Sequence, residues 1–339
     1  MSVLDYNART TWANLSLEEH SARWESYMNS GQIGFRCPKV ATAFFWYQSL
    51  RARIRGAKAT TDIEAGEVVC SVPVGSLFSD MTVGNTSLRI LQESLNAHQK
   101  VAEGPPGAKR NSKMRRLDER GLMALLVLRE TARTRSHLMP YAALILTHDV
   151  EGVPMLWPDD SPRWRRASPM LRSLAATSRA SAERNFEAIV PAAISRFGAV
   201  LSEGLECAAP SPGGGHPSCS HAELAAVYSR ERFLRTYAII AARDWVLPVY
   251  GRHRAFLAPV IDMLNYGQVG LRGRFDDKAG AFVVRATTPI KAGSELLFFY
   301  GSFCSDIAIN MYGFAPAGSV SCTRGRVTVP PSTGRSHGR

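Results

Sequence analysis

Apolar and polar positions follow strand-like patterns near both ends of the chain. Residues Ala57 to Thr60 alternate, and Glu67 to Pro73 is a β-branched run that a proline closes. After the middle of the chain, Ala258 to Asn265 is an apolar run with polar residues at its end, and Phe282 to Ala286 and Leu296 to Gly301 read as two buried strands. These patterns predict β-structure in two blocks that lie far apart in the sequence.

The segment between these blocks has helical spacing. A broad apolar face runs from Leu122 to Leu128, Leu171 to Phe197 is amphipathic, and Ala222 to Leu247 carries apolar residues at helical intervals. A further helix start is expected at Ser16 to Glu19, where the serine and glutamate match a capping box. Three segments rich in proline or glycine read as loops or mobile connections: Ala102 to Lys113, Ala208 to Ser220 and the tail from Ala315 onward.

One short pattern occurs in both β blocks. TDIEAGEVV at 61–69 returns in altered form as TPIKAGSELL at 288–297, with the same Ile, Ala-Gly and Glu before an apolar strand. This echo suggests a single β-rich domain whose halves are separated by a long helical insertion. The alternative is that I-x-A-G-x-E is simply a favourable turn between strands, used twice by chance.

Composition limits the class of protein. The chain has 339 residues and a formal charge of +12, from 41 Lys and Arg against 29 Asp and Glu, which favours an acidic or polyanionic partner. No apolar run approaches the ~18 residues of a membrane helix, and the N-terminus lacks the pattern of a secretory signal. The six cysteines contain no CxxC pair, so we expect neither a disulfide scaffold nor a metal site, and a reduced, intracellular protein.

A set of motifs in a fixed order carries a family resemblance. The motifs are Arg55 to Ala59, Thr61 to Glu67, Arg243-Asp244, Pro259 to Asn265, Ala292 to Gly301 and Tyr312-Gly313-Phe314. Their order resembles the SET-domain protein methyltransferases, in the branch of the Rubisco lysine methyltransferases and their histidine-methylating relatives. The resemblance covers roughly residues 30 to 315.

The resemblance implies an α+β fold, in which a SET-domain β-fold of short strands and small sheets is interrupted by a helical insertion. The expected parts are an N-terminal helical extension (1–35), the N-terminal part of the SET domain (36–80), the helical insertion (81–230), the C-terminal part of the SET domain (231–315) and a basic tail (316–339). The chain ends about 25 residues after Phe314. We therefore do not expect the helical substrate-binding domain that usually follows in the Rubisco branch.

The resemblance also implies an activity, the S-adenosylmethionine-dependent N-methylation of a lysine, or less readily a histidine, in a protein substrate. By this resemblance Gly56, Arg243, Asn265 and Tyr266 would bind the cofactor. Gly56 would allow close backbone approach, Arg243 would pair with the carboxylate, and Asn265 would bind the amino group or adenine. Tyr300 would be the catalytic tyrosine that orients the attacking nitrogen, and Tyr312 would wall the substrate channel.

Each of these residues also has a structural interpretation. Tyr300 follows two phenylalanines in an apolar run and could be a core tyrosine, while Arg243 could be a helix-surface arginine paired with Asp244 or Glu231. Asn265 could end a strand as a turn residue. Asp262 is expected to be a structural hydrogen-bond acceptor rather than a general base.

Two departures from the family pattern leave a second function open. The Asn-His pair of the family is Asn265-Tyr266 here, and its first G-x-G reads Ile54-Arg55-Gly56. A phenol next to the adenine and positive charge beside a sulfonium would both weaken cofactor binding. The alternative is therefore a catalytically reduced SET-fold component of a ribonucleoprotein such as a mitochondrial ribosome, which would place the chain in the mitochondrial matrix.

Clusters of arginine support this alternative, because arginine contacts phosphates and stacks on exposed bases. The candidate nucleic-acid-binding residues are Arg115, Arg116, Arg163, Arg165, Arg166, Arg252 and Arg254. A solvated basic face with no partner would have the same composition.

Overall fold

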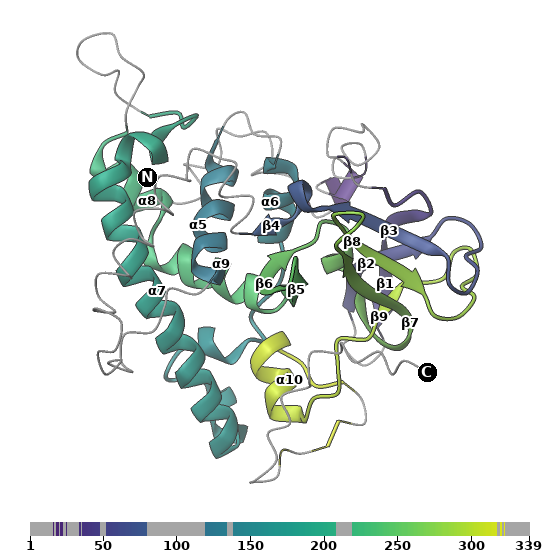
Figure 1. Cartoon of the computed structure of the whole chain (residues 1–339). Helices are drawn as coiled ribbons and strands as arrows, with labels where there is room; N and C mark the ends of the chain where they lie inside the picture. Colours follow the sequence, from purple (N-terminus) through teal and green to yellow (C-terminus); the bar gives the residue numbers. More distant parts are fainter. Residues whose placement is uncertain are drawn as a thin grey trace, which may run out of the picture. The chain divides into compact units, whose positions relative to one another are not determined.

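The structure is a computed structural model of the whole chain (Figure 1). It describes residues 36–47, 52–79, 119–133, 138–207 and 219–316, together with single positions near the two ends (16, 18, 19, 21, 22, 25, 34, 319, 320 and 322). The chain divides into two compact units, each built from separate stretches of sequence. The first comprises residues 1–24, 78–148 and 178–240, and the second comprises residues 25–77, 149–177 and 241–339.

The second unit holds nearly all of the strands. Its strands are β1 (Val40–Tyr47), β2 (Ala52–Ala59), β3 (Val68–Pro73), β5 (Trp245–Val249), β6 (Arg252–Leu257), β7 (Asn265–Asp276), β8 (Ala281–Ala286) and β9 (Leu297–Phe298). β1 pairs with β2 and β5 with β6, each antiparallel, while β3, β8, β7 and β9 form one sheet in that order. β7 runs parallel to β9 and antiparallel to β8. This unit also holds α10 (Ser305–Tyr312) and four short 3-10 turns, Val74–Ser76, Pro154–Leu156, Pro162–Arg166 and Ile261–Met263.

The two sequence echoes pair with each other in this unit. Ile63 and Ile290 form an antiparallel bridge with two backbone hydrogen bonds of 2.9 Å. Gly66 and Gly293 take up equivalent left-handed turns, with φ of 83° and 79°. Asp62 accepts from the backbone N–H of Ala292 at 2.8 Å and from Lys291 Nζ at 2.8 Å. The two β blocks from opposite ends of the sequence therefore lie in one unit.

Two stretches expected to be strands are only partly so. The run from Ala258 to Asn265 passes through a 3-10 turn at Ile261–Met263, because Val260 has a φ of 72° that no strand accommodates. The run from Leu296 to Gly301 contains only the two residues of β9, so Tyr300 lies beyond the strand. Both interruptions leave polar groups at the ends of strands rather than within a ladder.

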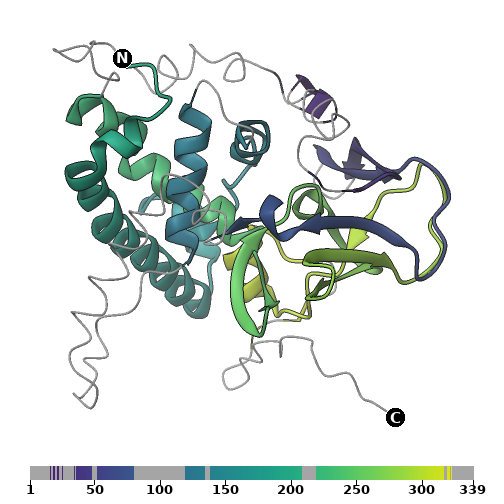
Figure 2. The same ribbon diagram turned by 45° about the horizontal axis from the view of Figure 1, so that its top comes forward.

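The first unit is helical. It contains α5 (Glu119–Ala132), α6 (Met139–Leu146), the greater part of α7 (Pro169–Ser202), α8 (His221–Val227), α9 (Arg230–Ala241) and the short strand β4 (Phe78–Ser79). Figures 1 and 2 show α7 running beside α5. The helices expected at 122–128 and 171–197 are confirmed, and so is the capping box at Ser16, whose hydroxyl accepts from the backbone N–H of Glu19 at 3.2 Å.

The helix expected from Ala222 to Leu247 is wrong in its extent. A capping box of Ser220 and Glu223 starts α8, and Tyr228 leaves helical geometry (φ −103°, ψ 37°), so α8 and α9 are separate helices. After Ala241 the chain enters β5, where alternating burial replaces the helical period. Apolar residues in β5 fit either pattern when the sequence is read alone, and pairing with β6 decides for the strand.

A buried charge cluster holds α5 against the C-terminal end of α7. The guanidinium of Arg129 donates to Glu130 Oε1 and to Glu203 Oε2, each at 2.7 Å, and to the backbone carbonyl of Val200. The Arg129 side chain is 0% exposed and Glu130 is 2% exposed, while Glu203 reaches solvent. Arg133 approaches the same Glu130 at 3.3 Å. Each desolvated charge therefore faces a charge of opposite sign and is hydrogen bonded to it.

All six cysteines form disulfides, which corrects the expectation of a reduced chain. The pairs are Cys37–Cys70, Cys207–Cys219 and Cys304–Cys322, with Cα–Cα distances of 4.3, 5.0 and 5.1 Å. Their separations of 33, 12 and 18 residues match no pattern that sequence alone would identify, because pairing depends on which segments the fold brings together.

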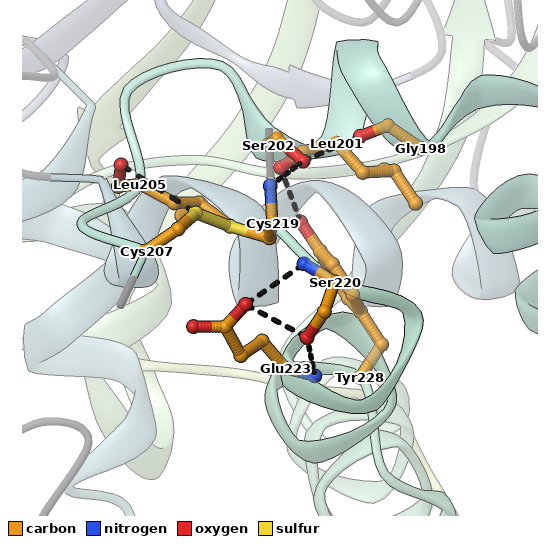
Figure 3. Close-up of a disulfide and its surroundings, with 9 residues drawn as sticks. All are labelled: Gly198, Leu201, Ser202, Leu205, Cys207, Cys219, Ser220, Glu223 and Tyr228. Atoms are coloured by element: carbon orange, nitrogen blue, oxygen red, sulfur yellow. Dashed lines mark hydrogen bonds between the residues drawn. A yellow bond between two sulfur atoms is a disulfide. The ribbon is translucent and has the colours of Figure 1, made fainter. Parts of the chain in front are cut away.

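The second disulfide joins the end of α7 to the start of α8 (Figure 3). Cys219 donates its backbone N–H to Ser202 Oγ at 3.0 Å, and the Ser202 hydroxyl donates to the carbonyl of Gly198 at 2.7 Å. The next residue, Ser220, caps α8 by accepting from the backbone N–H of Glu223 at 3.2 Å. The disulfide thus lies between two helix ends that are already hydrogen bonded.

Replacing Cys207 and Cys219 together by serine should lower the free energy of unfolding by about 3 kcal/mol, the usual effect of opening a loop of this size. Urea unfolding of the oxidised proteins measures this difference. A reducing agent should abolish the contribution of this pair, and an unchanged midpoint in the double variant under oxidising conditions would contradict the prediction.

Among the residues that the structure describes, no helix combines the length and the apolar character needed to cross a membrane.

Candidate functional site

Asn265, the first residue of β7, lies beside Gly56 of β2. Its side-chain Nδ2 donates to the backbone carbonyl of Arg55 at 3.2 Å and to Glu295 Oε1 at 2.8 Å. Glu295 Oε1 also accepts from the hydroxyl of Tyr47, the last residue of β1, at 2.9 Å. Three strands and the loop before β9 therefore contribute to one network. The members lie far apart in the sequence, and the pairing of β1 with β2 and of β7 with β9 helps to bring them together.

Gly56 is required at its position by this network. A Cβ atom there would lie 2.7 Å from Asn265 Nδ2, 2.9 Å from Glu295 Oε1 and 3.3 Å from the ring of Phe45. Real Cβ atoms do not approach other atoms at 2.7 Å, so the polar side chains would have to move. The absence of a side chain at Gly56 makes room for Asn265 and Glu295, which is a different use of the glycine from the close cofactor approach that the resemblance implies.

Changing Gly56 to alanine should displace Asn265 and Glu295 and lower the free energy of unfolding by about 1–3 kcal/mol, the usual cost of overpacking. Chemical denaturation measures the change. Gly75 is a matched control, because a Cβ there meets nothing within 4 Å. Equal stability of the two alanine variants would show that the network relaxes without cost.

Tyr300 occupies the centre of an aromatic cluster. Its hydroxyl donates to the backbone carbonyl of Leu264 at 2.5 Å. Its ring lies 5.7 Å from that of Tyr266 and 5.1 Å from that of Tyr312. The aromatic cluster consists of Tyr266, Phe299, Tyr300, Phe303, Tyr312 and Phe314, in consecutive ring contacts. Phe299 and Phe314 are partly exposed, so the cluster extends from the interior to the surface.

Burial is the main cause that raises the pKa of Tyr300 to about 12. The positive charge of Arg243 opposes this shift, and the carboxylates of Asp262 and Glu295 add to it. Tyr300 is therefore a neutral phenol at physiological pH. Since its proton is engaged by Leu264, its oxygen lone pairs are the groups left to meet a polar ligand.

Arg243 lies just after α9 and points toward the turn that precedes Asn265. Its Nη1 donates to the backbone carbonyl of Asp262, a residue only 5% exposed. The charge of Arg243 lowers the pKa of Tyr300, and the role of Arg243 in cofactor binding stays a prediction. The alternative that Arg243 pairs with Asp244 or Glu231 as a helix-surface arginine stays open. Asp262 has the enclosed position expected of a structural residue.

Two members of the site were not among the predicted residues. Glu295 stands inside the A-G-x-E motif, and its place next to the repeated turn was a usable signal. Tyr47 ends the aromatic run Phe44 to Tyr47, where nothing in the sequence distinguishes it from its neighbours. The burial of Tyr47 and its bond to Glu295 raise the pKa of its hydroxyl well above the usual range, so it too stays a neutral donor.

Those predicted nucleic-acid residues that the structure describes are not part of this network. Arg115 and Arg116 lie outside the described residues. Arg163 stacks over the ring of Trp157 at 5.7 Å and donates to the carbonyl of Glu151. The remaining ones lie on a 3-10 turn and on β6, where Arg165, Arg166 and Arg252 are exposed and Arg254 is partly buried.

No protein-family model matches this chain, and no curated protein matches it. Solved structures do. The SET domain of LSMT bound to lysine and AdoHcy matches with a TM-score of 0.58 and 14% identity, over 89% of this chain and 58% of that one. Rubisco LSMT bound to sinefungin and monomethyllysine gives a TM-score of 0.57 at 13% identity, over 90% of this chain and 57% of that one. Rubisco LSMT bound to AdoMet gives 0.56 at 14% identity.

The chain thus has the α+β SET fold, and it spans less than 60% of the length of the structures it matches. The fold expected from the order of the motifs is confirmed. At this level of identity the likeness extends to the fold and not to the activity.

Proposed function

We propose that this chain is an S-adenosylmethionine-dependent protein-lysine N-methyltransferase. The observation that carries the proposal is the Tyr300 hydroxyl, which stands within an aromatic cluster and donates to the carbonyl of Leu264, directly before Asn265. The SET structures of similar fold are bound to lysine and to AdoMet or AdoHcy, which supports the same ligand classes here. Methyl transfer needs positioning and exclusion of water more than covalent chemistry by side chains.

Asn265 and Arg243 have the chemistry to hold two groups of the cofactor. Asn265 retains its Oδ1 as an acceptor for an ammonium group, since its Nδ2 is engaged by Arg55 and Glu295. Arg243 carries a planar guanidinium next to the turn that precedes Asn265, and such a group is suited to holding the carboxylate of the cofactor. When bound, S-adenosylmethionine supplies a methyl group on a positively charged sulfur.

The residues around Tyr300 would hold the attacking amine. Because the Tyr300 hydroxyl donates its proton in a hydrogen bond to the carbonyl of Leu264, its oxygen can accept a hydrogen bond from the N–H of a neutral lysine amine. That bond would orient the lone pair of the amine nitrogen. The rings of Tyr266 and Tyr312 flank Tyr300 and would enclose the alkyl chain and exclude water. Aromatic faces also stabilise the cationic product before it leaves.

Two measurements test the proposal. Calorimetric titration with S-adenosylmethionine should show saturable binding at one site. Incubation with methyl-labelled cofactor and a cell extract should label discrete proteins, and hydrolysis should release methyllysine. Absence of heat at millimolar ligand, with the protein shown to be folded by circular dichroism, would contradict the proposal. Release of methylhistidine instead would support the histidine alternative.

The ribonucleoprotein function and the mitochondrial location stay predictions from charge and motif departures. Their test is the binding of structured RNA as a function of salt. Contacts between arginines and phosphates require a steep fall in affinity as salt rises, because each contact releases a counterion.

A further inference from the structure

The amide of Asn265 is held in one orientation. An asparagine amide can turn over and exchange its oxygen and nitrogen, and only its hydrogen-bond partners decide between the two states. Here both partners of the nitrogen are acceptors, the carbonyl of Arg55 and the carboxylate of Glu295. The reversed amide would bring its oxygen against these two acceptors, and the resulting repulsion forbids that state.

Glu295 is itself fixed by a second donor. The same oxygen, Oε1, accepts from the Tyr47 hydroxyl at 2.9 Å and from Asn265 Nδ2 at 2.8 Å. Gly56 leaves the room that this oxygen occupies, since a Cβ there would lie 2.9 Å from it. Contacts with β1 and β2 therefore hold the Glu295 carboxylate in place, and it cannot readily turn away from the Asn265 amide.

We propose that Glu295 is a positioning residue that fixes the Asn265 amide so that Oδ1, and not Nδ2, is presented to the ammonium group of the cofactor. The proposal rests on the proposed function. The reversed amide would present two N–H donors to a cation and repel it. The negative charge of the Glu295 carboxylate also attracts the ammonium group, and it offsets the positive charge of Arg243 in the same site.

Three variants separate these effects. Glu295→Ala removes the acceptor, Glu295→Gln keeps an acceptor oxygen without charge, and Tyr47→Phe removes only the donor that fixes Glu295. Glu64→Gln is the control, because it changes an exposed glutamate in the other copy of the echoed turn. S-adenosylhomocysteine is the probe for affinity. Selective ¹⁵N-asparagine labelling shows the side-chain amide of Asn265, assigned by its loss in Asn265→Asp.

The expected results are specific to orientation. Glu295→Ala should weaken binding of the probe about 10-fold or more, Glu295→Gln by less, and Glu64→Gln not at all. Without any ligand, the Asn265 amide protons should exchange slowly in the wild type and fast in Glu295→Ala, with melting temperatures compared to exclude general loosening.

The outcomes distinguish the two proposals. If the wild type fails to bind the probe, the proposed function is contradicted, and the cofactor role of Glu295 with it. If the wild type binds and Glu295→Ala binds equally well, the positioning role alone is overturned. Equal protection of the Asn265 amide in both proteins would overturn it without reference to any ligand.

A separate observation concerns the thiols. Every cysteine of the sequence is paired, and each pair joins residues that neighbouring hydrogen bonds also hold together. Arg36 and Ser71 bond beside Cys37–Cys70, and Ser305 donates its backbone N–H to the carbonyl of Val320 at 2.9 Å beside Cys304–Cys322. The two cysteines of each pair therefore lie on segments that the fold already joins, where oxidation of two thiols closes a bond.

We infer that the chain matures where thiols are oxidised, such as the secretory pathway or a periplasm. This inference competes with the mitochondrial matrix predicted from the sequence, because the matrix keeps thiols reduced. Each disulfide forms when two thiols lose two protons and two electrons, which a disulfide-bearing oxidoreductase accepts as it becomes a dithiol. This inference does not depend on methyl transfer.

The test traps thiols in cells that produce the full chain. Acid quenching, alkylation with a maleimide and intact mass measurement should show no modified cysteine before reduction and six after it. Modification of all six cysteines without reduction, in protein that circular dichroism shows to be folded, would overturn the inference. Expression in a bacterial cytoplasm with and without an oxidising background should show higher yield of folded protein in the oxidising strain.

Discussion

Tyr300→Phe is expected to lower the rate of methyl transfer by at least about 100-fold, the effect of removing one oriented polar group from an enclosed reaction site. The phenylalanine ring keeps the contacts with Tyr266 and Tyr312, so the walls of the site remain. What is lost is the oxygen that would orient the amine. Affinity for S-adenosylhomocysteine should change little, which places the loss in kcat.

Two controls accompany this variant. The carbonyl of Leu264 loses its donor, so a stability loss of about 1 kcal/mol is expected and is measured by urea unfolding. Tyr250→Phe removes a hydroxyl from a tyrosine that is 53% exposed, and it should leave the rate unchanged. A Tyr300→Phe protein that transfers methyl groups at the wild-type rate would remove Tyr300 from the mechanism.

Arg129→Met should lower the free energy of unfolding by about 3–5 kcal/mol, because it removes one partner of a fully buried ion pair. Methionine has a similar length and fills much of the space, so a cavity contributes little. The main cost is the Glu130 carboxylate, which is desolvated and would keep a weaker interaction with Arg133 at 3.3 Å.

Arg230→Met provides the matched comparison. Arg230 pairs with Glu183 at the surface of the same helical unit, with its side chain 59% exposed. Exposed pairs contribute less than about 1 kcal/mol, so this variant should unfold at nearly the wild-type denaturant concentration. If both substitutions cost the same, the Arg129 cluster is not desolvated in solution.

The sequence pattern predicted elements well wherever burial alone decided them. α5 and α7 have apolar faces of helical period, and β3 and β8 are β-branched runs, so each type followed from local periodicity. The errors fall where strand pairing or an unusual backbone angle decides. β5 is a strand because β6 lies beside it, and the run from Ala258 to Asn265 bends because Val260 adopts a positive φ.

The candidate site divides in the same way. Asn265, Tyr300, Arg243 and Gly56 stand in motifs, and the resemblance identified them together. Tyr47 was missed because its importance comes only from a contact with Glu295, 248 residues away. The disulfides were missed for a similar reason, since the sequence does not show which of six scattered cysteines lie close together in the fold.

The bridge between Ile63 and Ile290 has a consequence for synthesis of the chain. The two turns lie 227 residues apart, so the first turn emerges from the ribosome long before the second has been synthesised. β3 likewise cannot pair until its neighbour β8 has been synthesised. Until then the early strands present unpaired edges, a template for aggregation. Nascent chains stalled before residue 290 should therefore bind chaperones that recognise extended segments, and release should follow once the second turn has emerged.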